Sequence, residues 1–94
     1  MNHVSLDTPL VVPDDVIFRE LEGEAIILHL GTGTYFGLDE VGTRLWALVT
    51  ESGNLRHAVD VMAGEYDVER STLERDAIEL AGGLLEKGLV QAKA

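Results

Sequence analysis

The spacing of apolar residues changes once along the chain, at Asp39, and this change restricts the folds open to it. Between residues 16 and 38, apolar side chains recur with a period of two, in short runs separated by turn sequences. From residue 40 to residue 87 they recur every three or four positions, as on one face of a helix. A chain of 94 residues has room for one small core. The pattern predicts a single α+β domain, with strands first and helices after them.

The first half is expected to form a three-stranded antiparallel meander. Its strands are residues 16–21, 24–30 and 34–38, which are separated by Glu22-Gly23 and by Gly31-Thr32-Gly33. Turns this short join neighbouring antiparallel strands. In the second strand, alternation places residues 25, 27 and 29 on one face and residues 26, 28 and 30 on the other. The last strand, like the first, is expected to lie at an edge.

Three helices are expected in the second half. Asp39 is a good N-cap for the first and Asn54 for the second, which runs to about residue 65. Ser71 and Glu74 have the spacing of a capping box that opens the third helix. Gly88 is a natural left-handed end for that helix. Three strands followed by three helices give a winged-helix-like layout.

The domain is expected to span residues 14–91, after a flexible N-terminal segment over residues 1–13. Pro9 and Pro13 favour an extended path there and exclude a central strand. The N-terminus has neither the basic start nor the apolar run of a signal peptide. No apolar run along the chain is long enough to span a membrane. With no cysteine in the sequence, these features fit a cytoplasmic protein.

The charge balance excludes several partners. The chain has 7 Lys and Arg against 17 Asp and Glu, a net charge of −10. Sequence-independent binding to DNA or RNA needs a cationic surface, and so does docking on an anionic membrane. We therefore expect neither nucleic acid nor membrane as a partner. Among the few cations, Arg44 is expected to pair with Glu40, four residues before it on the same helix.

No set of residues in the sequence has the pattern of a catalytic site. His3, His29 and His57 are too scattered to form a metal site, and no thiolate is available. The paired carboxylates Asp14-Asp15 and Asp39-Glu40 fall at turns or helix caps, where they stabilise helix starts or solvated loops. We expect no catalytic residue, no metal and no cofactor, and interpret the chain as a non-catalytic binding module.

Two elements have unusual surfaces. Residues 34–38 contain no charge or proline that would protect an edge strand, so this edge is able to accept an added strand from a peptide. On the third helix, a border stripe runs beside the core stripe and includes Asp76, Leu80, Gly83 and Lys87. The mid-helix pair Gly82-Gly83 costs about 1 kcal/mol per glycine relative to alanine. Either a neighbouring element or a ligand is expected to approach the backbone there.

The sequence from Tyr35 to Trp46, YFGLDEVGTRLW, resembles the central signature of the PqqD family, named after protein D of pyrroloquinoline quinone synthesis. Residues 24–30, 65–68 and 87–90 follow in the order found in that family. The resemblance extends over roughly residues 11 to 91. The string of tyrosine, glycine, leucine and tryptophan is fairly specific, whereas the helical remainder is a weaker match.

The resemblance implies a RiPP recognition element, a peptide chaperone that binds the leader segment of a ribosomally synthesised precursor peptide. In this family the leader adds as a strand beside the third strand, in a groove shared with the third helix. The partners implied are the precursor peptide and a modifying enzyme, such as a radical SAM enzyme or a leader peptidase. Pyrroloquinoline quinone, lasso-peptide and related pathways all remain open. The implied peptide-binding residues are Thr34, Tyr35, Phe36, Gly37, Leu38, Asp76, Leu80, Gly83, Leu84 and Lys87.

Three other classes of protein share part of the pattern. A winged-helix DNA-binding protein has the same layout, but the net charge opposes it. A structural dimerisation domain would use the open edge strand on a second copy, so a homodimer is an open expectation. A small acidic carrier protein would have its attachment serine where Ser71 opens a helix, but that class is all-helical and does not fit three preceding strands.

Overall fold

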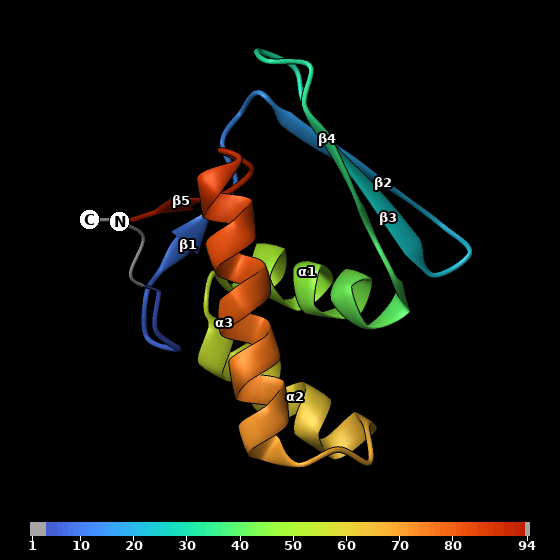
Figure 1. The fold of residues 1–94 in the computed structure, drawn as a ribbon, viewed down its shortest axis with the longest axis vertical. Coiled ribbons are helices and arrows are strands. Elements are labelled where there is room, and N and C mark those ends of the chain that lie inside the picture. The colour runs from blue at the N-terminus through green and yellow to red at the C-terminus, as the bar shows by residue number, and fades with distance from the viewer. Residues whose placement is uncertain (1–3, 94) are drawn as a thin grey trace.

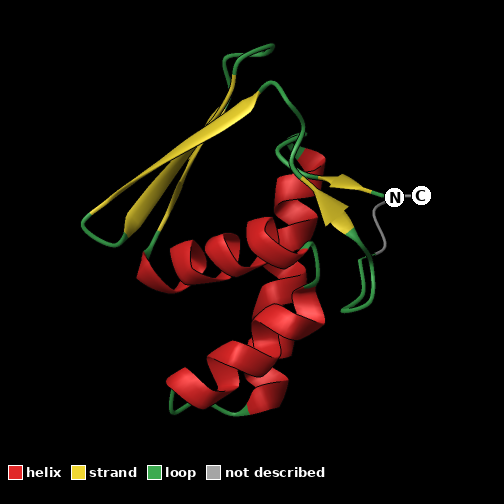
Figure 2. Ribbon diagram, turned by 180° about the vertical axis from the view of Figure 1, so that it is seen from behind, coloured by secondary structure: helices red, strands yellow, loops and turns green. Residues whose placement is uncertain are grey.

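The computed structural model describes residues 4–93, and it confirms the predicted order of three strands followed by three helices (Figure 1). The sheet packs on α1, and α2 lies on the other side of α1, with α3 crossing both helices (Figure 1). Seen from behind, the sheet extends well beyond the helices (Figure 2). The elements are β1 (Leu10–Val11), β2 (Val16–Leu21), β3 (Glu24–His29), β4 (Tyr35–Leu38), α1 (Glu40–Ser52), α2 (Leu55–Glu65), α3 (Arg70–Glu86) and β5 (Gln91–Ala92).

The meander is an antiparallel sheet in the order β2-β3-β4, so β2 and β4 are its edges, as predicted. Ile27 pairs with Phe18 on one side and with Phe36 on the other, and the side chains of these three residues share the face turned toward α1. Ile27 is fully buried and Ala25 nearly so. The predicted alternation is therefore confirmed, with the odd-numbered residues of β3 inward.

A buried hydroxyl group joins the sheet to the first helix. Thr43 in α1 accepts a hydrogen bond from the Ala25 amide, with 2.8 Å between nitrogen and Oγ1, and donates one to the Leu38 carbonyl at 3.4 Å. Ala25 and Leu38 are partners in the β3–β4 register. The threonine thus satisfies backbone groups at the end of the ladder and fixes β4 against α1.

The predicted caps of the first two helices are confirmed. The Asp39 carboxylate accepts a hydrogen bond from the Gly42 amide at 2.8 Å, and the Asn54 side chain accepts one from the His57 amide at 3.1 Å. Gly42 has little room for a side chain, because a Cβ atom there would lie 3.2 Å from the Asp39 Oδ1 atom and 3.3 Å from Leu38. This close approach explains a glycine in the first turn of α1.

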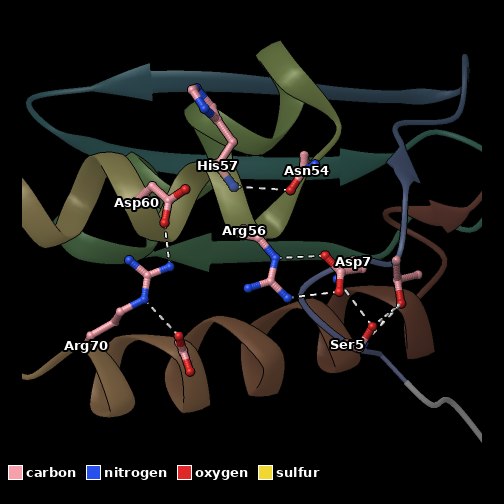
Figure 3. A network of polar contacts seen from close by, with 9 residues as sticks. Ser5, Asp7, Asn54, Arg56, His57, Asp60 and Arg70 are labelled. Carbon is pink, nitrogen blue, oxygen red and sulfur yellow. Dashed lines mark hydrogen bonds and ion pairs between the residues drawn. The ribbon is translucent and has the colours of Figure 1, made fainter.

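The start of the third helix differs from the prediction. The helix begins at Arg70, and Ser71 lies inside it instead of capping it, so the capping box is wrong. The Glu74 carboxylate accepts a hydrogen bond from the Arg70 Nε atom at 2.9 Å, and Arg70 also bonds Asp60 of α2 (Figure 3). Glu74 thus bonds an arginine side chain, whereas a capping box would need it to bond the Ser71 amide.

The predicted helix end at Gly88 is confirmed. Gly88 has a φ of 74°, in the left-handed region that favours glycine. Its amide bonds the Leu85 carbonyl at 3.1 Å, and the Leu89 amide bonds the Leu84 carbonyl at 2.9 Å. This pair of bonds is a Schellman motif. The turn places Leu89 and Val90 in the core, where both are at most 1% exposed.

The N-terminal segment is packed on the helices, which corrects the expectation of a flexible leader for residues 4–13. Leu6 and Leu10 are buried, and β1 pairs with β5. The Arg56 guanidinium group donates two hydrogen bonds to the Asp7 carboxylate, at 2.8 and 2.9 Å (Figure 3). These bonds hold the pKa of Asp7 below its ordinary value of 3.8. Residues 1–3 lie outside the described part.

The pairing predicted for Arg44 is also wrong. Instead of Glu40 on its own helix, Arg44 binds Glu65 at the end of α2, with two hydrogen bonds of 2.6 and 2.9 Å. A bidentate pair between two helices has better geometry than a contact along one helix. It lowers the pKa of Glu65 and raises that of Arg44.

Within residues 4–93, the helices are too short or too polar to span a membrane.

Candidate functional site

A groove of about 760 Å³ opens between β4 and the helices. Phe36 and Leu38 of β4 line one side, and Ala77 and Leu80 of α3 line the other. Leu80 is a half-buried residue at the groove, and Ala77 and Leu38 are buried. The groove is therefore an apolar trough beside an edge strand. The full lining is Phe36, Gly37, Leu38, Asp39, Val41, Gly42, Leu45, Val59, Met62, Leu73, Asp76, Ala77, Glu79 and Leu80.

The backbone of β4 has free hydrogen-bonding groups along the open edge. The His29 amide bonds the Thr34 carbonyl at 2.8 Å, which fixes the alternation of the ladder, so Phe36 bonds back to β3. The amides and carbonyls of Tyr35 and Gly37 consequently point away from β3. None of the turn, loop and cap hydrogen bonds among residues 4–93 uses them. An added strand would find both residues ready to pair.

One pair of side chains connects the two walls beyond Leu80. Lys87, at the C-terminal end of α3, places its Nζ atom 5.8 Å from the centroid of the Phe36 ring. That distance lies within the range of a cation–π interaction. Phe36 is half-buried, so its ring presents apolar surface to the groove and to the lysine at once.

The outer margin of the α3 wall is acidic. Asp76 and Glu79 both line the groove and both are exposed. The Asp76 side chain is 61% exposed, and its nearest cation is Arg75, 3.8 Å away and itself exposed. A pair so long and so exposed contributes little energy. The Asp76 carboxylate is thus available to a positive group entering the groove.

The glycine pair in α3 has open space beside it. Atoms outside the helix's own neighbouring backbone all lie more than 4 Å from a Cβ atom built on Gly82 or on Gly83. Close packing against a neighbouring element within the chain, one of the two explanations for these glycines, is therefore wrong. The open space beside Gly83, on the border stripe, leaves room for a ligand.

The groove brings together half of the residues that the family resemblance implied. Phe36, Gly37, Leu38, Asp76 and Leu80 all line it. The other five do not, although Lys87 reaches the groove through Phe36.

Of those others, Tyr35 belongs to the edge but not to the lining, because its side chain lies on the opposite face of the sheet. Thr34 precedes β4, and its carbonyl bonds the His29 amide. Gly83 lies farther along α3 than the lining residues. Leu84 is buried in the core, next to Trp46, and presents no surface to a peptide. Its placement among the implied contacts is not supported by the structure.

Sequence reasoning missed the floor of the groove. Val41 and Leu45 of α1 and Met62 of α2 line it, although the spacing of apolar residues after Asp39 indicates only a core-facing side of each helix. Val41 is 45% exposed, which is unusual for a residue on a core stripe. The only sequence signal for such a floor is an apolar stripe on a helix that is too wide for the neighbouring elements to cover.

The groove offers contacts that suit a bound peptide. Among residues 4–93 no group of three or more His, Cys, Asp or Glu side chains could hold a metal ion. The ion pairs that shift pKa values, such as Arg44 with Glu65, involve residues outside the groove lining. Apolar walls and an unpaired strand edge together suit an extended peptide, with main-chain bonds on one side and side-chain contacts on the other.

The chain is similar to known proteins in sequence and in fold. A family model described as coenzyme PQQ synthesis protein D (PqqD) matches residues 24–90. A solved structure of TbiB1 in complex with the TbiA(beta) leader peptide is 41% identical, with a TM-score of 0.82 over 88% of this chain and 96% of that one. A lasso peptide synthetase B1 complexed with the leader peptide shares the fold, at 20% identity and a TM-score of 0.79 over 87% and 96%. No curated protein matches the chain.

Proposed function

Since the chain belongs to the PqqD family, we propose that it captures the leader segment of a ribosomally synthesised precursor peptide and presents the peptide to a modifying enzyme. The observation that carries the proposal is the unpaired edge of β4 beside an apolar groove. The chain itself is proposed to do no chemistry. TbiB1, at 41% identity, was solved with a leader peptide, which supports the same class of ligand here.

In the proposed complex the leader forms a fourth strand next to β4. Its backbone pairs with the outward-pointing amides and carbonyls of Tyr35 and Gly37. Successive side chains of a strand point to opposite faces. Every second leader residue is therefore directed toward the groove, on the same face as Phe36 and Leu38.

The groove sets which side chains the leader presents. Apolar leader residues pack between Phe36 and Leu80, where their burial is worth about 1.5–3 kcal/mol per large side chain. A basic residue is favoured near Asp76. The space beside Gly83 allows the leader backbone to approach α3 closely. Lys87 stays at the end of the groove, on the Phe36 ring.

The proposed partners are the precursor peptide and the enzyme that modifies it. That enzyme is a radical SAM enzyme, a leader peptidase or a related catalyst, in a pathway to pyrroloquinoline quinone, a lasso peptide or another ribosomal product. Ribosomal synthesis of the precursor places the proposed capture in the cytoplasm.

The test is a titration of ¹⁵N-labelled protein with the leader of the precursor encoded beside this chain, followed by amide chemical shifts. We expect saturable shifts at residues 34–38 and 76–87, and none with a scrambled leader of the same composition. Shifts confined to other residues, such as β1 and β5, would reject the proposed site. No saturable shift with any leader segment of that precursor would reject the function.

A further inference from the structure

The face of the sheet that points away from the helices is apolar. Ile17, Leu28 and Tyr35 form one row across the three strands, and Ile26 follows in the next row. Ile17 is 50% exposed, Ile26 59%, Tyr35 73% and Leu21, farther along β2, 74%. We call these five residues the outer face.

Packing of the core does not explain why the outer face is apolar. The opposite face supplies the buried residues of the sheet, among them Ala25 and Ile27. An antiparallel sheet with one face on a core normally carries polar residues on the other face. A contiguous group of exposed large apolar residues, in contrast to isolated ones, marks a protein interaction surface.

The charges around the outer face are acidic. Glu24, at the start of β3, shares the face of Leu21, Glu22 lies in the turn before it, and Asp14 and Asp15 precede β2; all four are exposed. Arg19, the single cation in β2, pairs with Ile26 and therefore lies among the residues of the outer face. A second copy of the chain would bring two acidic rims together, and like charges in apposition oppose association. The surface instead fits a partner with an apolar patch rimmed by lysine and arginine.

The outer face is continuous with the strand edge of the proposed peptide site. Tyr35 contributes its side chain to the outer face and its backbone to that edge. A peptide strand added beside β4 would place every second side chain next to Tyr35, on the outer face. A protein that covered this face would therefore touch the captured peptide as well as the sheet.

We infer that the outer face is the docking surface for the enzyme that acts on the captured peptide, and that this enzyme presents an apolar patch with a basic rim. The identity of the partner rests on the proposed function. The surface differs from the groove, since its side chains point to the opposite side of the sheet.

The test compares the double variant Ile17→Thr/Ile26→Thr with the wild-type chain. Threonine keeps a β-branched side chain and removes apolar surface at two exposed positions. The matched control is Val68→Thr, an exposed apolar residue between α2 and α3. Two affinities are measured for each protein: that for the encoded leader peptide, and that for the encoded modifying enzyme without peptide.

We expect the double variant to lose at least about tenfold in affinity for the enzyme, corresponding to about 1.4 kcal/mol. Its affinity for the leader is expected to stay within about twofold, and Val68→Thr to change neither. Enzyme affinity equal to wild type in the double variant overturns the inference. So does a wild-type chain that does not bind the enzyme.

A second measurement does not depend on the variants. Methyl cross-saturation from the enzyme to the labelled wild-type chain should reach Ile17, Leu21 and Ile26. Saturation only at other methyl groups rejects the inference. Light scattering could instead show that the wild-type chain is a dimer and the double variant a monomer. That result would assign the outer face to a second copy of the chain and would reject the enzyme as its partner. Failure of the leader titration, by contrast, rejects the proposed function. The enzyme affinity is measured without peptide, so it still tests the outer face as a docking surface.

Discussion

The Lys87 Nζ atom lies 5.8 Å from the centroid of the Phe36 ring, which links the end of α3 to the edge strand β4. The two residues are 51 positions apart, the difference between 87 and 36. Because Phe36 also lines the groove, this contact orients a residue of the proposed binding wall.

Replacing Lys87 with glutamine is expected to lower the free energy of unfolding by about 0.5–1 kcal/mol, because the cation–π interaction is lost. Lys87→Arg keeps the positive charge over the ring and should stay close to wild type. Urea denaturation measures both variants. Equal losses in the two variants would show that the charge over Phe36 contributes nothing.

Replacing Gly37 with proline is expected to weaken leader binding at least about tenfold, because proline removes an amide that points to the open edge. Gly37→Ala is the control. It keeps the amide, and a Cβ atom there meets nothing within 4 Å, so its affinity should stay within about threefold of wild type. Fluorescence anisotropy with labelled leader measures both. Unchanged binding by Gly37→Pro would contradict strand addition at this edge.

Reversing the charge of Asp76 with lysine is expected to weaken binding of a leader with a basic residue near that position. The loss should be about twofold to fivefold, the contribution of an exposed ion pair, and should shrink at high salt. Asp67→Lys makes the same charge change outside the groove lining and should have a smaller effect. A loss that is equal in the two variants would point to net charge instead of a local contact.

Replacing Thr43 with valine is expected to cost about 1–3 kcal/mol of unfolding free energy, because the buried Ala25 amide loses its partner. The shape of the side chain is retained, so packing should change little. Thr50→Val is the matched control, since the Thr50 hydroxyl only bonds the Ala47 carbonyl one turn back on the same helix. Chemical denaturation gives both values, and similar costs at the two positions would reject the special role of Thr43.

The hydrogen bonds from Arg56 make the pKa of Asp7 lower in the folded than in the unfolded chain. Their contribution to stability is therefore complete above the ordinary value of 3.8 and is lost as the pH falls through the folded pKa. Asp7→Asn should lower the melting temperature at neutral pH and approach wild type in acid. Thermal unfolding from neutral pH to about pH 2 tests this. A constant difference across that range would contradict it.

Local patterns predicted the elements well, because the signals for them are local. Alternation around Ile27 gave the faces of the sheet, and the side chains of Asp39 and Asn54 capped the helices that follow them. The open edge at residues 34–38 could also be predicted, since a meander of three strands leaves its last strand at an edge.

Long-range choices between partners could not be predicted. Arg44 had an acidic neighbour on its own helix but binds Glu65, because the end of α2 offers a bidentate geometry. Glu74 had a serine at the right spacing but bonds Arg70. The packing of Leu6 and the floor residue Met62 depend on how distant elements meet. Periodicity gives the face of an element, not the neighbour that covers it.

The pairing of β1 with β5 bears on how such a module can be joined to other proteins. Leu10 lies opposite Ala92, so both ends of the described chain leave the domain at one place, beside the end of α3 and away from the β2–β3 turn (Figure 1). Domains whose ends lie close together tolerate fusion and insertion. A catalytic domain could be linked at either end, or the whole module inserted into a loop of one, without covering β4.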